Sequence, residues 1–367
     1  MRSSRCPWTA AILAAATASL AAPTATLAAA PSRWAADPGL TGGSVPVPRE
    51  GQAVDTRRAT TVIGRGTPAG CTSRAVVRAV ARGGVIRFDC GPRPVRILMT
   101  ATAKVVNARG RRVVLDGGGR VTLSGAGKRR ILYMNTCDPA QRFTTPTCQN
   151  QDHPRLTVQN LTLADGNATG QRQEGGGGGA IFVRGGRFKV VNSRFVRNRC
   201  DASGPDLGGA AIRVLSQYRG LPVHVVGSTF GGGPGLGGRC SNGGALSSIG
   251  VSWEIRNSLF SHNSAIGRGA NPAQAGTPGG GSGGALYADG NDFTVRIAGS
   301  LMQDNRAAEG GGAVFFVSND RTGTMAIERS TLQRNRSAGF ETRGLPGIFF
   351  LGARRPAVTD STLRRAP

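Results

Sequence analysis

Acidic residues are scarce in this sequence, and so are lysine, histidine and aromatic residues. Its 367 residues include 20 Asp and Glu, 3 Lys and 3 His, and aromatic residues make up 5% of the chain. Glycoside hydrolysis needs two carboxylates that flank one bond, and no such pair stands out among so few acids. No Cys-x-x-Cys or His-x-x-x-His spacing occurs, so we expect no metal site and no cofactor.

The chain also lacks a hydrophobic run long enough to cross a membrane. An Ala/Leu-rich stretch at 9–22 follows Arg2 and Arg5 and precedes small residues at 28–30. That order is typical of a cleaved secretory signal peptide. Cys6 lies ahead of the apolar stretch, where a lipoprotein acylation site would not be. We therefore expect residues 1–30 to be a signal peptide and the mature protein to be secreted, with no transmembrane segment.

Glycine is abundant, with 57 residues, and a glycine pair opens one of two blocks that alternate along the chain. One block is Gly-Gly-Ala followed by an aliphatic residue, and the other is Ser-x-apolar-x-x-Asn. The first occurs at 178–181, 243–246, 283–286 and 311–314, with a variant at 209–212, and the second at 193–198, 258–263, 300–305 and 330–335. Periods of roughly 20–50 residues indicate a repeat architecture.

Apolar residues recur at fixed positions around the Ser of each copy. They lie five and three residues before it and two after it: Phe188, Val223, Trp253, Val295 and Met325; Val190, Val225, Ile255, Ile297 and Ile327; Phe195, Phe230, Phe260, Met302 and Leu332. This alternation predicts a strand with one apolar face in each copy. One copy cannot bury that face alone, so successive copies are expected to stack as parallel strands. The predicted fold is all-β, a parallel β-helix, since disordered sequence would not keep these positions in register.

The two blocks carry a family resemblance. Gly-Gly-Ala-aliphatic alternating with Phe-x-x-Asn, as in 178–181 with 195–198 and in 243–246 with 260–263, resembles the repeats of the chlamydial polymorphic outer membrane proteins. More broadly, residues 60–367 are similar to the right-handed β-helix proteins of the pectate-lyase-like superfamily. The resemblance implies a right-handed, single-stranded parallel β-helix. It implies no single function, because that superfamily includes lyases, hydrolases, adhesins and phage tailspikes.

The predicted β-helix domain spans residues 61–367, with regular repeats from about residue 156. Residues 31–60 are rich in Pro, Gly and Ala without periodicity, which predicts a flexible lead-in. Thr72 and Ser73 can cap a short helix over 74–81, which we expect to cover the open hydrophobic end of the stack. Brief strands are expected at 85–88, 95–98, 104–107, 113–115, 121–123, 131–134 and 156–163.

Six of the seven cysteines lie beyond the signal peptide, and an even number in an exported chain favours disulfides. Cys71 and Cys90 bracket the expected helix, and Cys137 and Cys148 bracket one polar loop. Cys200 and Cys240 lie in the same loop of consecutive copies. We prefer these three pairings among the fifteen that six cysteines allow.

Arginine supplies almost all of the positive charge, with 43 Arg and a formal net charge of +26. On an exported surface this charge favours an anionic polysaccharide or cell-surface polymer as partner, and nucleic acid only non-specifically. Arg197 and Arg334, and then Arg199, Arg306 and Arg336, fall in matching positions beside the repeated Asn. Stacking would align them in stripes that suit an extended polyanion, although solvated corners commonly carry such charges. The sequence indicates no oligomeric state.

An outward column of charged residues lies four residues before the Ser. Successive copies carry Lys189, His224, Glu254 and Arg296 there, which are the candidate catalytic residues of a β-elimination on a uronic acid. Arg296, or Arg256 in the next outward column, would neutralise the carboxylate, and Lys189 or neutral His224 would take the neighbouring carbon proton. Cross-strand charge pairing on a solvated sheet would produce the same pattern.

A second outward column follows the Gly-Gly-Ala block and includes Arg213 and Tyr287. Together with Arg256, these are the candidate substrate-binding residues. The aromatic members of the column, Phe182, Tyr287, Phe315 and Phe349, could stack against sugar rings, or they could lie under a loop.

Two functions of different classes remain open. The first is an exported β-helix that binds an anionic polysaccharide or cell-surface polymer in an adhesive or structural role. The alternative is a metal-independent polysaccharide lyase. The motifs of polygalacturonase-like hydrolases are absent, and residues 354–356 match only part of the Arg-x-Pro-x-x-Arg segment of calcium-dependent pectate lyases. Binding is the favoured function, and an enzyme, if the chain is one, would be a lyase.

Overall fold

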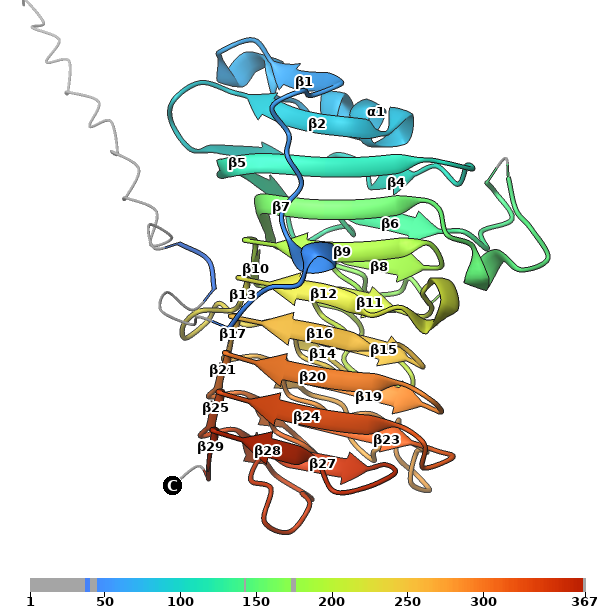
Figure 1. Ribbon diagram of the computed structural model, residues 1–367, viewed down its shortest axis with the longest axis vertical. Coiled ribbons are helices and arrows are strands. Elements are labelled where there is room, and N and C mark those ends of the chain that lie inside the picture. Colours follow the sequence, from blue (N-terminus) through green and yellow to red (C-terminus); the bar gives the residue numbers. More distant parts are fainter. Residues whose placement is uncertain (1–36, 40–44, 142, 173–175, 366–367) are drawn as a thin grey trace, which may run out of the picture. The chain divides into compact units, whose positions relative to one another are not determined.

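Long parallel β-sheets are the main secondary structure of the computed structural model, which describes residues 37–39, 45–141, 143–172 and 176–365 (Figure 1). Three sheets, named here A, B and C, contain 17, 8 and 4 strands. The predicted signal peptide, residues 1–30, lies outside the described residues. The chain is all-β, and its registers are compatible with the predicted parallel β-helix.

The strands belong to the three sheets as follows. Sheet A contains β1 (Thr61–Gly64), β2 (Gly84–Asp89), β3 (Val95–Leu98), β5 (Arg112–Ser124), β7 (Arg155–Ala164), β9 (Arg187–Val191), β10 (Arg194–Val196), β12 (Val223–Val226), β13 (Thr229–Phe230), β16 (Trp253–Arg256), β17 (Leu259–Ser261), β20 (Thr294–Ala298), β21 (Leu301–Gln303), β24 (Thr324–Glu328), β25 (Thr331–Gln333), β28 (Ala357–Thr359) and β29 (Thr362–Arg364). Sheet B contains β4 (Ala103–Val105), β6 (Leu132–Asn135), β8 (Ile181–Arg184), β11 (Ile212–Val214), β15 (Leu246–Ile249), β19 (Leu286–Gly290), β23 (Val314–Ser318) and β27 (Ile348–Leu351). Sheet C contains β14 (Arg239–Cys240), β18 (Ser264–Ala265), β22 (Arg306–Ala307) and β26 (Arg336–Ser337).

Each of the four repeat units from β11 to β26 contributes one strand to sheet B, two to sheet A and one to sheet C, in that order along the chain. The units β15 to β18 and β19 to β22 follow this order, and each strand pairs in parallel with its counterpart in the next unit. Adjacent parallel strands lie about 4.8 Å apart. Residues at the same position of successive units are therefore neighbours along the stack.

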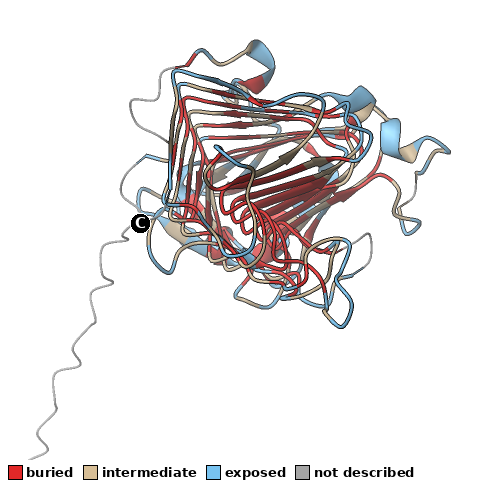
Figure 2. Ribbon diagram, turned by 90° about the horizontal axis from the view of Figure 1, so that it is seen from below, coloured by how far each residue is buried: buried red, intermediate tan, exposed pale blue. Residues whose placement is uncertain are grey.

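The predicted apolar face forms the core. All fifteen residues of the three apolar positions are buried, and buried residues fill the inside of the stack in Figure 2. The rings of Phe195, Phe230 and Phe260 stack on one another with centroids 4.6 Å apart at each step. The prediction of one apolar face per copy is confirmed.

Side-chain ladders at the corners explain the Ser and Asn of the second block. The hydroxyl of Ser258 accepts a hydrogen bond from the Ser228 N–H at 3.1 Å and donates to the Arg256 carbonyl at 2.8 Å. Ser193, Ser228, Ser300, Ser330 and Ser361 continue this ladder. At the next corner, Asn305 Oδ1 accepts from the backbone and side chain of Asn263, at 3.0 and 2.9 Å. These polar groups are buried but satisfied, so the corners cost little free energy.

The first described α-helix, α1 (Ser73–Arg82), agrees with the helix expected over 74–81. Thr72 Oγ1 accepts a hydrogen bond from the Ala75 N–H at 3.2 Å, and the helix ends at Gly83, whose φ is 78°. Its buried residues Val76, Ala79 and Val80 belong to the main core cluster. The helix thus covers the N-terminal end of the stack, as expected (Figure 1). Short 3₁₀ helices lie at η1 (Arg49–Gly51), η2 (Pro68–Gly70), η3 (Cys148–Asn150) and η5 (Tyr218–Gly220).

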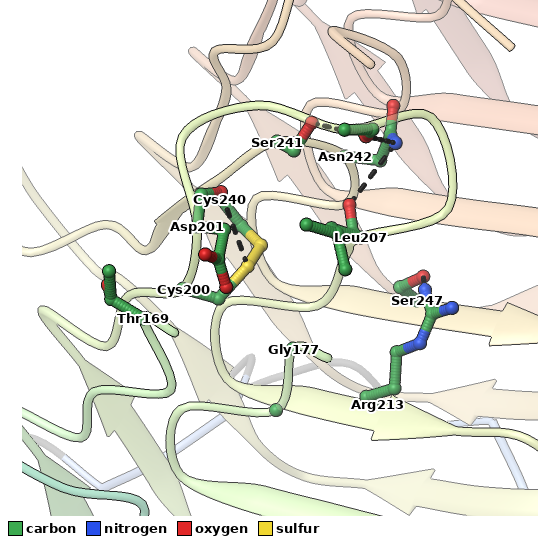
Figure 3. The surroundings of a disulfide bond; sticks show 12 residues. Thr169, Gly177, Cys200, Asp201, Leu207, Arg213, Cys240, Ser241, Asn242 and Ser247 are labelled. Carbon is green, nitrogen blue, oxygen red and sulfur yellow. Dashed lines mark hydrogen bonds between the residues drawn. A yellow bond between two sulfur atoms is a disulfide. The ribbon is translucent and has the colours of Figure 1, made fainter. Parts of the chain in front are cut away.

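All three preferred cysteine pairings are confirmed. Disulfides join Cys71 to Cys90, Cys137 to Cys148 and Cys200 to Cys240. The first ties Cys71, two residues before α1, to Cys90, which directly follows β2, and the third joins equivalent positions of two successive units (Figure 3). The strands expected at 113–115 and 121–123 differ from the prediction, because both belong to the single strand β5 with a register irregularity between Asp116 and Val121. Strand β1 has no counterpart among the expected strands.

Candidate anion-binding face

Sheet C aligns exposed arginines in a row. Arg199 pairs with Arg239, Arg239 with Ser264, Ser264 with Arg306, and Arg306 with Arg336. The residues that follow them, Cys200, Cys240, Ala265 and Ala307, are buried, so strand alternation points the arginines outward. We call Arg199, Arg239, Arg306 and Arg336 the arginine stripe.

Described acidic side chains offset little of the stripe's charge, although the charge of Arg306 contributes to lowering the pKa of nearby Asp304. All four arginines are exposed, and within the described ranges none of them forms an ion pair with a carboxylate. Arg199 Nη2 donates to the Gly127 carbonyl at 2.7 Å. Four strand steps separate Arg199 from Arg336, so the stripe extends roughly 19 Å along the stack. A row of like charges at this spacing produces a positive potential that attracts a linear polyanion.

The sequence prediction of aligned arginines did not include Arg239, although the sequence contains a signal for its position. Its unit lacks the repeated Asn and carries Gly231 to Gly238 in its place, which obscures the alignment. Arg239 nonetheless precedes Cys240 as Arg199 precedes Cys200, and this repeated Arg-Cys pair marks the equivalent position.

Arg197 and Arg334, predicted in a neighbouring stripe, lie beside acidic residues of the preceding units. Arg197 Nε lies 2.7 Å from Asp165 Oδ1, and Arg334 Nε lies 2.7 Å from Asp304 Oδ1. The hydrogen bond from Arg334 lowers the pKa of Asp304. This corner therefore alternates in charge, whereas the arginines on sheet C form no ion pair with an acid among the described residues.

The predicted catalytic column is in register. Lys189 pairs with His224, His224 with Glu254, and Glu254 with Arg296 on successive strands of sheet A. Arg256 Nε lies 3.0 Å from Glu254 Oε2, and Arg296 Nη2 lies 3.3 Å from Glu328 Oε2. The carboxylates that these arginines contact thus come from the protein itself.

The described part of the predicted lead-in crosses this column. We call residues 45–60 the N-terminal strap, the blue segment that runs along sheet A in Figure 1. Lys189 Nζ donates to the carbonyls of Glu50 and Gln52, at 2.9 and 2.6 Å, and Arg256 Nη1 donates to the Pro46 carbonyl at 3.0 Å. The strap therefore lies over Lys189 and His224 on the solvent side, whereas Arg296 at the other end of the column is exposed.

Two side-chain amides, from Gln159 on β7 and from Asn257 directly after β16, bind the strap as a neighbouring strand would. Asn257 accepts a hydrogen bond from the Val45 N–H at 3.1 Å and donates to the Val45 carbonyl at 3.0 Å. Gln159 makes the same pair of bonds with Val54, at 2.9 and 3.0 Å. Sequence periodicity could not reveal these contacts, because the strap is not part of the repeat.

Burial under the strap changes the basicity of two column residues. It lowers the pKa of Lys189, and the nearby positive charge of Arg112 lowers it further. Burial also lowers the pKa of His224, whose Nδ1 is buried without a hydrogen-bond partner among the described residues. Both shifts favour the neutral base that proton abstraction needs, but a polymer could reach these groups only after the strap moved.

The candidate binding residues Arg213 and Tyr287 are almost completely buried. Arg213 Nη1 donates to Ser247 Oγ at 2.7 Å (Figure 3). The Tyr287 hydroxyl lies 3.0 Å from Asp289 Oδ2 and 2.8 Å from Asn271 Nδ2, and its ring stacks on Phe315. Burial lowers the pKa of Arg213 to about 10. These residues pack beneath loops, which is the arrangement that the sequence left as the alternative to sugar stacking.

Comparison with known proteins finds no relative. No family model, no curated protein and no solved structure matches the chain. Among the described residues, no three His, Cys, Asp or Glu side chains gather as a metal site. The helices in the same part of the chain are all too short or too polar to cross a membrane.

Lysine acylation should report the position of the strap. We expect an N-hydroxysuccinimide ester to modify exposed Lys128 readily and Lys189 slowly, because two carbonyls and the strap surround Lys189 Nζ. Replacing both Gln159 and Asn257 with alanine removes four hydrogen bonds to the strap, each worth about 1 kcal/mol, and should speed modification of Lys189 about tenfold or more. Peptide mass mapping measures all three lysines at once, with Lys104 and Lys128 as internal controls. Equal rates at Lys128 and Lys189 in the unaltered protein would contradict the strap.

Proposed function

We propose that the chain is an exported, right-handed, single-stranded parallel β-helix that binds an anionic polysaccharide or cell-surface polymer along sheet C. Its parallel registers and repeated corner ladders support the fold. Three disulfides are compatible with an extracellular protein. The role would be adhesive or structural.

The observation that carries this proposal is the arginine stripe. Arginine presents a planar fork that matches carboxylate and sulfate groups with two hydrogen bonds. A small anion could contact one or two members of the stripe, whereas a linear polymer could contact all four at once. Exposed ion pairs are worth only about 0.2–1 kcal/mol each, so useful affinity requires several of them along one molecule. The preferred ligand class is therefore a chain with repeated carboxylate or sulfate groups.

A charge-matched pair of variants tests the proposal. The stripe variant replaces Arg199, Arg239, Arg306 and Arg336 with glutamine, and the control variant replaces Arg65, Arg74, Arg78 and Arg82, which are exposed around α1. Both lose four positive charges. At low salt we expect the stripe variant to bind polygalacturonate or heparin about tenfold or more weakly than the unaltered protein. The control variant should change much less. Equal losses in the two variants would reduce the binding to a net-charge effect and reject the site.

A second candidate function is the metal-independent polysaccharide lyase, and one observation favours it. Lys189 and His224 lie on adjacent strands, and burial lowers the pKa of both side chains. The same glycan panel tests this candidate through the ultraviolet absorbance of unsaturated uronate products. The Gln159, Asn257 double variant should then be more active than the unaltered protein, because the strap covers the column. Absence of product with both proteins would exclude this function for the glycans tested.

A further inference from the structure

A cavity of about 380 Å³ opens beside the N-terminal part of sheet B. Thr102, Lys104, Arg130, Tyr133, Asp138 and Gln171 line it, together with Gly170. Pockets for small molecules have volumes of roughly 300–1,000 Å³, so this one would accept a single sugar ring. Gly170 lies three residues after Asn167, which pairs with Arg199 at the end of the arginine stripe.

Arg130 is the unusual member of the cavity, because no acidic residue in the described part of the chain pairs with its buried side chain. It is 5% exposed, and its Nε and Nη2 donate to the carbonyls of Gly178 and Gly177, at 3.0 and 2.6 Å. Its Cζ lies 5.0 Å from the Phe182 ring centroid and 5.7 Å from that of Tyr133. No described residue accepts a hydrogen bond from the remaining nitrogen, Nη1.

Burying the positive charge of Arg130 has a free-energy cost. A buried guanidinium without a counter-charge is destabilising, and burial lowers the pKa of Arg130 to about 10. An anion in the cavity would offset that cost and accept from Nη1. Because the guanidinium is already ordered by two carbonyls and two aromatic rings, little side-chain entropy would be lost on binding.

The other walls combine a second cation with hydroxyl-binding groups. Exposed Lys104 places its Nζ 5.6 Å from the Tyr133 ring centroid, in register with Tyr133 on β4 and β6. The Tyr133 hydroxyl accepts from Asn135 Nδ2 at 2.9 Å and donates to Asp138 Oδ2 at 3.2 Å. Asp138 and Gln171 can bond sugar hydroxyl groups. Two cations against one carboxylate leave the cavity positive.

We propose that this cavity is a subsite for one acidic sugar unit, a uronic acid whose carboxylate lies between Arg130 and Lys104. The inference rests on the proposed function and deepens it. A chain along the arginine stripe would place its terminal unit in the cavity, since the lining residues Gly170 and Gln171 follow closely on Asn167, which pairs with Arg199 at the N-terminal end of the stripe. A uronic acid fits better than a free inorganic anion, because the cavity is far larger than such an ion and has hydroxyl-binding groups opposite the cations.

Calorimetric titration with the monosaccharide galacturonate tests the subsite on the full chain. We expect saturable binding of galacturonate and none of neutral galactose or sulfate at the same concentrations. Lys104→Gln should weaken galacturonate binding about tenfold, as expected for loss of one charge-assisted hydrogen bond. Lys128→Gln, which removes an exposed lysine outside the cavity, is the matched control and should leave binding unchanged, as should the stripe variant. Arg130→Gln should abolish binding of galacturonate. If the Arg130→Gln variant fails to fold, Lys104→Gln still tests the subsite.

The outcomes separate this inference from the proposed function. Absence of galacturonate binding, equal weakening by Lys104→Gln and Lys128→Gln, or equal binding of sulfate would overturn the subsite. Retention of polygalacturonate that depends on the stripe would still support the proposed function in each of those cases. Conversely, galacturonate binding without stripe-dependent retention of the polymer would support a monosaccharide site and reject the chain along sheet C.

Discussion

Replacing Phe230 with alanine is expected to lower the free energy of unfolding by about 3–5 kcal/mol. Phe230 is fully buried, and its ring lies between those of Phe195 and Phe260, with interplanar angles of 3° and 4°. The backbone around it is paired in parallel with both neighbouring units. Stacked strands on both sides limit collapse into the space left by the ring, so most of the cavity cost should remain. Urea denaturation followed by tryptophan fluorescence or circular dichroism measures the change.

Leu98→Ala is the matched control for the core substitution. Leu98 is 56% exposed on β3, and substitutions at such positions usually change stability by less than about 0.5 kcal/mol. A loss of under about 1 kcal/mol for Phe230→Ala would show that the aromatic ladder does not pack as described.

Asn305→Leu should be similarly damaging, although it exchanges side chains of similar volume. The Asn305 amide donates to the Phe260 carbonyl at 3.0 Å and to Asn335 Oδ1 at 2.8 Å, and its Oδ1 accepts two bonds from Asn263. Leucine would leave the Asn263 N–H, the Asn263 amide and the Phe260 carbonyl buried without these partners. Each such group costs about 1–3 kcal/mol, so a loss of at least about 3 kcal/mol is expected. Thermal or urea unfolding measures it.

The control for the ladder is Asn291→Leu. Asn291 is exposed, and the described structure uses its backbone carbonyl rather than its side chain, accepting from Ser318 Oγ. We expect little change in stability there. If Asn291→Leu and Asn305→Leu cost the same, the corner ladder contributes nothing specific to stability.

The repeat units were predictable because their geometry constrains residue type at each position. The first glycine of each Gly-Gly-Ala block shows why. Gly243 has a φ of 53°, and a Cβ there would lie 2.1 Å from the Leu246 carbonyl oxygen, so a larger residue fits neither the conformation nor the space. Ala245 and Leu246, which follow, are buried. Constraints of this kind recur in every unit, and they are visible as a period in the sequence.

The strap and the burial of the second column were not predictable in the same way. Residues 45–60 have no period, and their partners Gln159 and Asn257 lie more than a hundred residues away in the chain. The ion pair between Arg334 and Asp304 joins different units at a corner, so it depends on a register that the sequence pattern specifies only approximately. Loop contacts such as those of Asn271 with Tyr287 follow from side-chain chemistry rather than from repetition.

The salt dependence of polyanion affinity tests the central claim most directly. Each arginine that neutralises an anionic group of a polyelectrolyte releases condensed counterions, which adds roughly 0.9 to the slope of log affinity against log salt for duplex DNA and somewhat less for more weakly charged chains. Affinity for polygalacturonate should be measured over a range of salt for the unaltered protein and the stripe variant. Contact of all four stripe arginines with one chain predicts slopes that differ by about 2–4. Parallel slopes would show that the polymer does not lie on Arg199, Arg239, Arg306 and Arg336, and would contradict the account.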